Sequence, residues 1–133
     1  MANTRSQDPK TALMQAIMNG DISVLSHLLQ EDVPLNVRDS GGLTPLMWAA
    51  GSNHLDVIQA LLAAGAEINA KSLTGRTALM FAAQAGHPLI VKQLLDAGAD
   101  AEAIDKSGVT AQQIAERHGH KQILDMLKQV EES

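Results

Sequence analysis

Residues 39–71, DSGGLTPLMWAAGSNHLDVIQALLAAGAEINAK, give the length and the pattern of a repeating unit. Residues 72–104, SLTGRTALMFAAQAGHPLIVKQLLDAGADAEAI, follow without a gap and keep similar residue types at the same positions. The four residues Thr44-Pro45-Leu46-Met47 have counterparts at Thr11-Ala12-Leu13-Met14 and Thr77-Ala78-Leu79-Met80, and Thr110-Ala111 continues the series. A fixed period of this length is typical of solenoids. We therefore expect one domain over residues 1–133, with repeats at about 6–38, 39–71, 72–104 and 105–133.

The second unit is expected to form two helices. Thr44 is a favourable N-cap, and Pro45 suits the first helical position because its missing N–H needs no partner there. The first helix then runs to about Ser52. The second runs from about Leu55 to Ala64 and carries one apolar stripe at helical spacing, formed by Val57, Ile58, Leu61 and Leu62.

Glycine and asparagine mark the turns around these helices. Each first helix is followed by a residue of one of these two types, namely Gly20, Asn53, Gly86 and Gly119. Both types adopt the left-handed conformation at little cost, so we expect the helix to end there. A second series, Gly42, Gly75 and Gly108, lies two residues before each N-cap threonine and predicts a tight turn with positive φ.

The composition favours closely packed helices. Hydrophobic residues make up 45% of the chain but aromatic residues only 2%, so Ala, Leu, Ile, Val and Met must form the core. The absence of cysteine excludes disulfides, thiol catalysis and cysteine-based zinc sites, and a cytoplasmic protein is the simpler expectation. The net charge of -5 and the lack of a basic patch argue against a nucleic-acid partner. No apolar run approaches about 18 residues, so we expect no membrane insertion.

A 33-residue period with a β-turn and two helices resembles the ankyrin repeat. The matching residues of the second unit are Asp39, Gly42, Thr44-Pro45-Leu46, Ala49-Ala50, His54, Val57-Ile58, Leu61-Leu62, Gly65-Ala66 and Asn69-Ala70. The resemblance covers about residues 8–130. It implies an all-α ankyrin-repeat solenoid of four helix-turn-helix repeats with short β-turn fingers.

The chain departs from the family pattern in three places. Ankyrin repeats usually carry His after Thr-Pro-Leu, bonded to the Thr hydroxyl, whereas this chain has Met14, Met47 and Met80. We expect these turns to lose a polar contact and gain an apolar column. In the first unit Asp32-Val33 replaces the usual Gly-Ala. The last unit has Gln112, Gln113 and Glu116 where the third has Leu79, Met80 and Ala83. Polar residues suit a capping repeat, whose outer face meets water, so we expect capped ends. We also expect a monomer.

Three histidines at equivalent positions, His54, His87 and His120, suggest a metal site at first sight. Zinc needs its ligand nitrogens about 2.0–2.1 Å away, whereas stacked helices lie about 8–10 Å apart. We therefore expect each histidine to begin a second helix and to form local hydrogen bonds. His118 and His120 are closer together, but one pair without a cysteine is a weak signal. The sequence thus indicates no metal and no cofactor.

The sequence contains no catalytic motif. It lacks a Walker loop, G-x-G-x-x-G, H-E-x-x-H and G-x-S-x-G, and a short solenoid offers a groove rather than a deep pocket. We therefore expect a protein that is not an enzyme. The resemblance implies a protein–protein interaction module that acts as an adaptor, an inhibitor or a regulator of a partner protein. The alternative is a regulatory protein that binds a small ligand or a metal around His118 and His120.

In ankyrin proteins the turn tips and the exposed side of the first helices form a concave groove, and the resemblance implies that a partner binds there. The candidate binding residues are Leu43, Met47, Trp48, Ser52, Leu73, Arg76, Met80, Gln84, Lys106, Val109 and Arg117. We expect Leu43, Leu73, Ile104 and Val109 to be exposed at the turns, where apolar clusters mark interaction sites. Arg38, Lys71, Arg76, Lys106 and Arg117 are expected on one side, which predicts an acidic partner.

Trp48 and Phe81 are the only Trp and Phe residues, and they occupy equivalent positions. One interpretation places them in the core between repeats, in space that Leu usually fills. The other makes them partly exposed anchors in the groove, because Trp is enriched at interfaces. Substitution of Trp48 by Ala separates the two. Loss of a core residue would cost about 3–5 kcal/mol, whereas loss of an anchor would spare stability and weaken binding.

Overall fold

The computed structural model describes residues 9–31 and 33–132. The helices of this part of the chain are α2 (Pro9–Asn19), α3 (Ile22–Gln30), α4 (Pro45–Gly51), α5 (Leu55–Ala63), α6 (Ala78–Ala85), α7 (Pro88–Asp96), α8 (Ala111–Arg117) and α9 (Lys121–Glu132). Residues 6–8, where the first repeat is expected to begin, and Asp32 of the first-unit departure lie outside the described residues.

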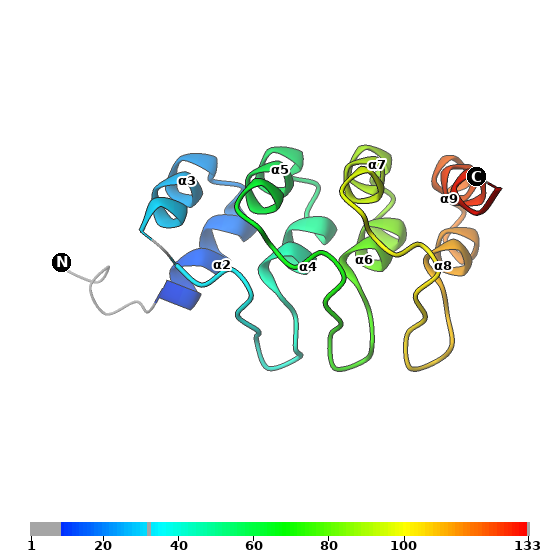
Figure 1. Ribbon diagram of the computed structural model, residues 1–133, viewed down its shortest axis with the longest axis horizontal. Helices are drawn as coiled ribbons and strands as arrows, with labels where there is room; N and C mark the ends of the chain where they lie inside the picture. Colours follow the sequence, from blue (N-terminus) through cyan, green and yellow to red (C-terminus); the bar gives the residue numbers. More distant parts are fainter. Residues whose placement is uncertain (1–8, 32, 133) are drawn as a thin grey trace.

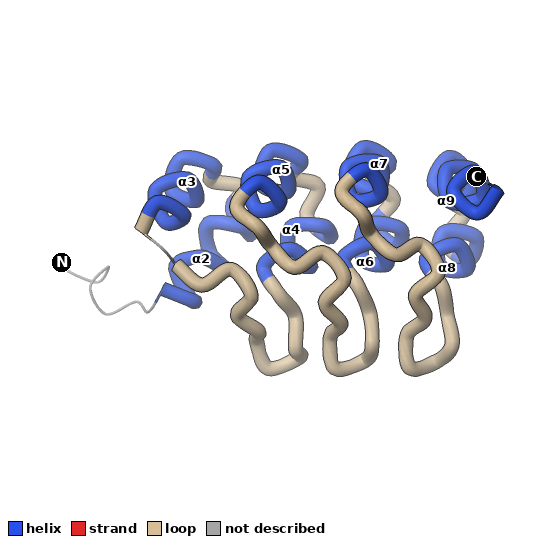
Figure 2. The backbone as a smooth tube through the Cα atoms, in the orientation of Figure 1, coloured by secondary structure: helices blue, strands red, loops and turns tan. Residues whose placement is uncertain are grey.

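The helices form hairpins that stack in line (Figure 1). The first helices of the hairpins, α2, α4, α6 and α8, make an inner row, and their partners α3, α5, α7 and α9 make an outer row. Figure 2 shows the connections from α3 to α4, α5 to α6 and α7 to α8 projecting beyond the inner row as finger loops. Among the described residues, the only β pairing is an isolated bridge between Ile104 and Thr110. The predicted all-α solenoid of helix-turn-helix repeats is confirmed.

Threonine side chains cap three inner helices. The hydroxyls of Thr44, Thr77 and Thr110 accept hydrogen bonds from backbone N–H groups three residues later, at 3.3, 3.4 and 3.2 Å. The Thr44 N–H in turn donates to Sδ of Met47 at 3.4 Å, and the Thr110 N–H donates to Oε1 of Gln113 at 3.1 Å. The Met47 side chain thus makes no hydrogen bond with the Thr44 hydroxyl, but its sulfur, a weak acceptor, contacts the Thr44 backbone N–H instead.

The turn residues have the backbone conformation that the sequence predicts. The residues after the inner helices, Gly20, Asn53, Gly86 and Gly119, have φ of 66°, 59°, 79° and 72°. Gly42, with φ of 78°, also allows the fingers to stack, because a Cβ there would lie 2.8 Å from the backbone nitrogen of Leu73. That nitrogen donates to the carbonyl of Gly41 at 3.1 Å. The same bond joins the next two fingers, from Lys106 N–H to the carbonyl of Thr74 at 3.0 Å.

Aliphatic side chains fill the space between the two rows of helices. The predicted stripe of α5 is buried at Val57, Ile58 and Leu61, and Leu62 is half-buried. The inner helices contribute buried alanines, which let the rows approach closely, at Ala49, Ala50, Ala82, Ala83 and Ala115. Burial of each large aliphatic side chain contributes about 1.5–3 kcal/mol, so the contacts between repeats supply most of the stability.

The histidines at the start of the outer helices connect neighbouring repeats. Nε2 of His120 lies 3.0 Å from the carbonyl oxygen of Gln84, which belongs to the preceding repeat. The His120 ring also lies over Gly86, where a Cβ would come within 2.6 Å of it. The ring of His54 covers Gly20 in the same way, at 2.5 Å. The expectation of local hydrogen bonds is wrong for His120, because this side chain points along the solenoid axis.

Candidate protein-binding groove

A groove between the finger loops and the inner helices contains two hollows. The first, which we call the apolar hollow, has a volume of about 260 Å³ and is lined by Leu43, Met47, Trp48, Gly51, Ser52 and Phe81. The second, which we call the charged hollow, has a volume of about 420 Å³. Its polar lining includes Thr74, Arg76, Gln84, Asp105, Arg117 and His118. Each hollow lies between two adjacent repeats, so both are formed by stacking of the units.

Trp48 forms one wall of the apolar hollow and is held in place by a hydrogen bond. Its side chain is half-buried, and its indole N–H donates to Oδ2 of Asp39 at 2.9 Å. The Ser52 hydroxyl donates to the carbonyl oxygen of Trp48 at 2.7 Å. Phe81, also half-buried, lines the same hollow from α6. Both aromatic rings therefore combine the two predicted interpretations, since each packs against the core and also lines the groove.

Asp39 organises the finger that borders the apolar hollow. Its Oδ1 accepts hydrogen bonds from the N–H groups of Gly41 and Leu43, both at 2.9 Å. Burial alone would raise the pKa of Asp39, but the hydrogen bonds from Leu43, Trp48 and Gly41 outweigh it and lower the pKa below its usual value. The carboxylate is thus kept charged by the same bonds that fix the turn and orient the indole.

Arg76 stands between the two hollows. Its Cζ lies 4.8 Å from the centroid of the Phe81 ring, a distance at which cation and ring attract each other. Burial lowers the pKa of Arg76, and the charge of Asp105 opposes this shift. Nε of Arg76 is buried and has no hydrogen-bond partner among the described residues. The guanidinium is therefore a partly buried cation with at least one N–H that the described chain leaves without an acceptor.

Asp105 occupies in the fourth repeat the position that Asp39 has in the second. Its Oδ1 accepts from the N–H groups of Ser107 at 2.8 Å and Val109 at 3.0 Å. The hydrogen bond from Val109 lowers the pKa of Asp105 most, and the charges of Arg76 and Arg117 lower it further. The charged hollow thus contains two guanidinium groups and one carboxylate, which leaves one positive charge.

The predicted binding residues do not all face the groove. Leu73 is 61% exposed at a finger tip, and Gln84, Lys106 and Arg117 are exposed, whereas Leu43 and Ser52 are half-buried. Three predicted residues are buried, with exposed fractions of 2% for Met47, 1% for Met80 and 9% for Val109. Met47 contributes to the floor of the apolar hollow and Val109 to the lining of the charged one. The expected exposure of Val109 is wrong, because its backbone closes the base of the finger through hydrogen bonds with Asp105.

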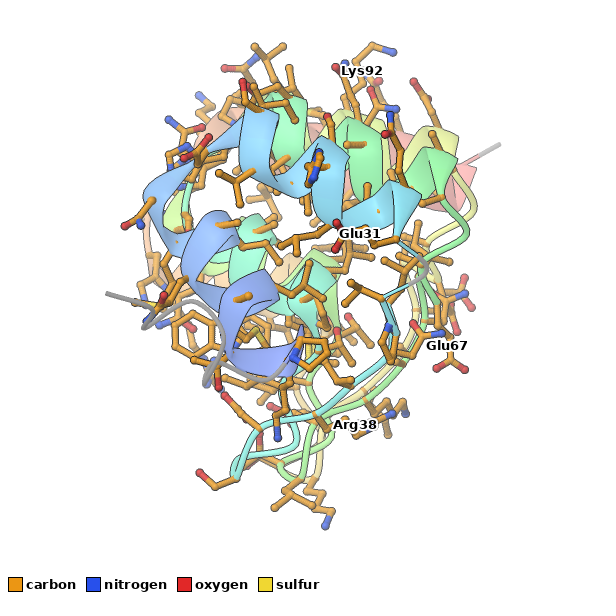
Figure 3. All side chains as sticks on the ribbon, turned by 90° about the vertical axis from the view of Figure 1, so that its left-hand side faces the viewer. Glu31, Arg38, Glu67 and Lys92 are labelled. Atoms are coloured by element: carbon orange, nitrogen blue, oxygen red, sulfur yellow. The ribbon has the colours of Figure 1, made fainter. Side chains whose placement is uncertain are left out.

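The basic residues divide between two sides of the fingers, which corrects the prediction of a single basic surface. Figure 3 places Arg38 on the side of the finger loops that faces away from the inner helices, together with Glu67. Arg38 donates there to backbone carbonyls of Gly42 and Lys71, and Nζ of Lys71 donates to the carbonyl of Ile104 at 3.3 Å. These cations connect successive fingers, whereas Arg76 and Arg117 line the groove.

The histidine pair at the end of α8 shows no metal-binding geometry. The rings of His118 and His120 are stacked, with centroids 6.1 Å apart. Nδ1 of His118 lies 3.0 Å from the carbonyl of Ile114, and Nε2 of His120 is bonded to Gln84. No group of three His, Cys, Asp or Glu residues within the described chain is arranged to hold a metal ion.

Two residues that line the hollows, Gly51 and Asp105, are not among the predicted binding residues. Gly51 is the last residue of α4, and a Cβ built on it would have no neighbour within 4 Å beyond its own helix backbone. Asp105 faces both groove arginines. A signal for Asp105 is present in the sequence, because an aspartate three residues before a turn glycine recurs at Asp39 and Asp105 and is typical of side-chain capped turns.

A further hollow of about 380 Å³ lies on the outer row, between α7 and α9. Figure 3 shows its lining residue Lys92 on the outer helices, far from the fingers. Lys92 is paired with Asp96 at 3.1 Å, an exposed ion pair of small energetic value. None of the predicted binding residues lines this hollow.

A family model described as ankyrin repeats (3 copies) matches residues 1–72 and 69–132. The chain belongs to the ankyrin-repeat family. Repeats of this family are in general protein–protein interaction modules, and they are typically not catalytic. No curated protein matches this ankyrin-repeat chain in sequence. None of the helices in the described parts of the chain is both long and apolar enough to cross a membrane.

Proposed function

We propose that this chain is a non-catalytic adaptor, inhibitor or regulator that binds one partner protein in the groove between its fingers and inner helices. One observation carries the proposal: equivalent positions around the groove keep the same backbone but hold different side chains. Leu43, Arg76 and Val109 are equivalent to one another, as are Gly51, Gln84 and Arg117. Such variation on a repeated frame produces a specific surface without altering the fold.

The chemistry of the groove supports recognition rather than catalysis. Its ionisable groups are two arginines, one aspartate bonded to backbone N–H groups, and His118. No nucleophile with an adjacent base and oxyanion donors is found among the described residues of the groove. An aromatic wall beside an arginine is instead a combination that is enriched at the energetic centres of protein interfaces.

A quantitative affinity purification tests this proposal. The groove variant Leu43→Arg/Arg76→Glu/Gln84→Arg and the control variant Val24→Arg/Gln59→Arg/Lys92→Glu change charge equally, and the control residues are exposed on outer helices. Partners recovered with the wild-type chain are quantified by mass spectrometry and then purified for titration. We expect the groove variant to lose the partner and the control to keep it.

Circular dichroism and thermal unfolding establish first that both variants keep the fold. A purified partner that binds the folded groove variant as tightly as it binds the wild-type chain would refute the proposal. If only the outer-helix control lost the partner, the binding surface would instead lie on α3, α5 and α7.

A further inference from the structure

Gly51 opens the apolar hollow. The equivalent residues of the third and fourth repeats are Gln84 and Arg117, whose side chains line the charged hollow. Gly51 ends α4 without a positive φ, and at such a position glycine costs about 0.4–1 kcal/mol relative to alanine, because it makes the unfolded chain more flexible. A Cβ at Gly51 would meet no neighbour within 4 Å beyond its own helix backbone, so no described residue of this chain requires glycine there. The missing side chain leaves room beside Trp48 for a group from outside the chain.

The arginines of the charged hollow share one carboxylate neighbour. The charges of Arg76 and Arg117 both lower the pKa of the nearby Asp105 carboxylate, and Nε of Arg76 is buried without a hydrogen-bond partner among the described residues. Oδ1 of Asp105 is occupied by two backbone N–H groups. The single excess positive charge contrasts with the net charge of -5 of the whole chain. An incoming carboxylate would neutralise this charge and accept guanidinium hydrogen bonds, which are among the strongest in proteins.

The two hollows lie one repeat apart along the groove. Stacked helices are separated by about 8–10 Å, and this sets the distance between one hollow and the next. About three residues of an extended segment, at roughly 3.3 Å each, cover that distance, as do about six or seven residues of a helix. A single short segment can therefore reach both hollows.

We propose that the occupant of the groove is an acidic segment of the partner protein, which places one apolar side chain in the apolar hollow and one carboxylate against Arg76 and Arg117. The inference rests on the proposed function and names the chemistry of the partner. Phe81 connects the two binding sites, because its ring lines the apolar hollow and also packs against the Arg76 guanidinium.

Selection from a displayed library of random 16-residue peptides tests this inference, with the immobilised full chain as bait. We expect enriched peptides to carry a large apolar residue and Asp or Glu at one fixed spacing. Their affinities are then measured by fluorescence anisotropy on the wild-type chain and three variants. Gly51→Leu fills the apolar hollow, Arg76→Gln/Arg117→Gln removes the cations, and Gln59→Leu is the matched control on the outer side of the same repeat.

We expect the arginine variant to weaken binding about 10- to 100-fold, the range for loss of hydrogen bonds to a charged group. Gly51→Leu should weaken it about 10-fold or more, and Gln59→Leu should have no effect. Raising the salt concentration should weaken binding to the wild-type chain more than binding to the arginine variant.

Enrichment of peptides without acidic residues, failure to enrich any acidic peptide, or undiminished binding to the folded arginine variant would each overturn the inference. Binding of inorganic phosphate in place of acidic peptides would do the same. This inference and the proposed function can fail separately. If a natural partner needs the groove but binds Arg76→Gln/Arg117→Gln as tightly as the wild-type chain, binding in the groove stands and the acidic segment is refuted.

Discussion

The apolar and charged hollows have the same backbone and opposite chemistry. Leu46 and Leu79, at equivalent positions of α4 and α6, are both 1% exposed and fix the inner helices in the same way. The differences lie at equivalent pairs of groove residues, among them Leu43 and Arg76, Gly51 and Gln84, Phe81 and Ile114, and Gln84 and Arg117. The buried positions of each repeat therefore determine where a hollow forms, and the groove positions determine what it can bind.

The largest loss of stability is expected from Leu79→Ala, which acts on α6, the helix that contributes to both hollows. Truncation of a fully buried leucine costs about 2–5 kcal/mol, through lost burial and the cavity left behind. Urea unfolding followed by circular dichroism measures this loss. The exposed groove residue Gln84 provides the control, since Gln84→Ala should change stability by less than about 0.5 kcal/mol. Equal effects of the two substitutions would contradict the division between buried and groove positions.

The second prediction compares two glycines at the C-terminal ends of inner helices, Gly86 after α6 and Gly51 as the last residue of α4. Gly86 has φ of 79°, and a Cβ there would come within 2.6 Å of the His120 ring. We therefore expect Gly86→Ala to destabilise the protein by about 1–3 kcal/mol. Gly51→Ala should instead stabilise it by about 0.4–1 kcal/mol, because the end of α4 has room for the methyl group and alanine makes the unfolded chain less flexible. Thermal unfolding of both variants measures these two changes in stability. A destabilised Gly51→Ala variant would show that the glycine has a structural role.

A smaller effect is expected when the indole of Trp48 loses its N–H. Trp48→Phe keeps an aromatic wall in the apolar hollow but removes the hydrogen bond to Asp39, and about 1 kcal/mol of stability should be lost. Because Trp48 is the only tryptophan, circular dichroism rather than fluorescence must follow unfolding. In a double-mutant cycle with Asp39→Asn the two effects should not add. Full additivity would mean that the hydrogen bond contributes nothing.

The last prediction concerns acid. Asp39 and Asp105 have lowered pKa values in the fold, so each contributes stability that is present above the ordinary value of 3.8 and is lost as the pH falls through the lower value. Asp39→Asn should be less stable than the wild-type chain at pH 7. The difference should shrink as the pH falls below 3.8, and urea titrations at several pH values measure it. A constant difference down to pH 2 would contradict the assigned shift.

The repeat pattern predicted the helices, the caps and the left-handed residues, because each depends on local chemistry. Thr44 and Gly42 behave as their neighbours in sequence imply. The burial of Met80 and Val109 could not be read in the same way, since it depends on how closely the finger base approaches the inner helix. The position of Arg38 could have been predicted from the sequence. Side chains alternate along an extended segment, so the neighbour of Asp39 points away from the groove.

The contact between His120 and Gln84 joins two neighbouring repeats, and this has a consequence for partial unfolding. Because each repeat contacts only its neighbours, a solenoid can begin to unfold at one end and continue inwards. The last finger and α8 supply one side of the charged hollow, whereas α4 and α6, further from that end, line the apolar hollow. Unfolding of the last hairpin alone would therefore remove the charged hollow, while the apolar hollow between Trp48 and Phe81 stayed intact.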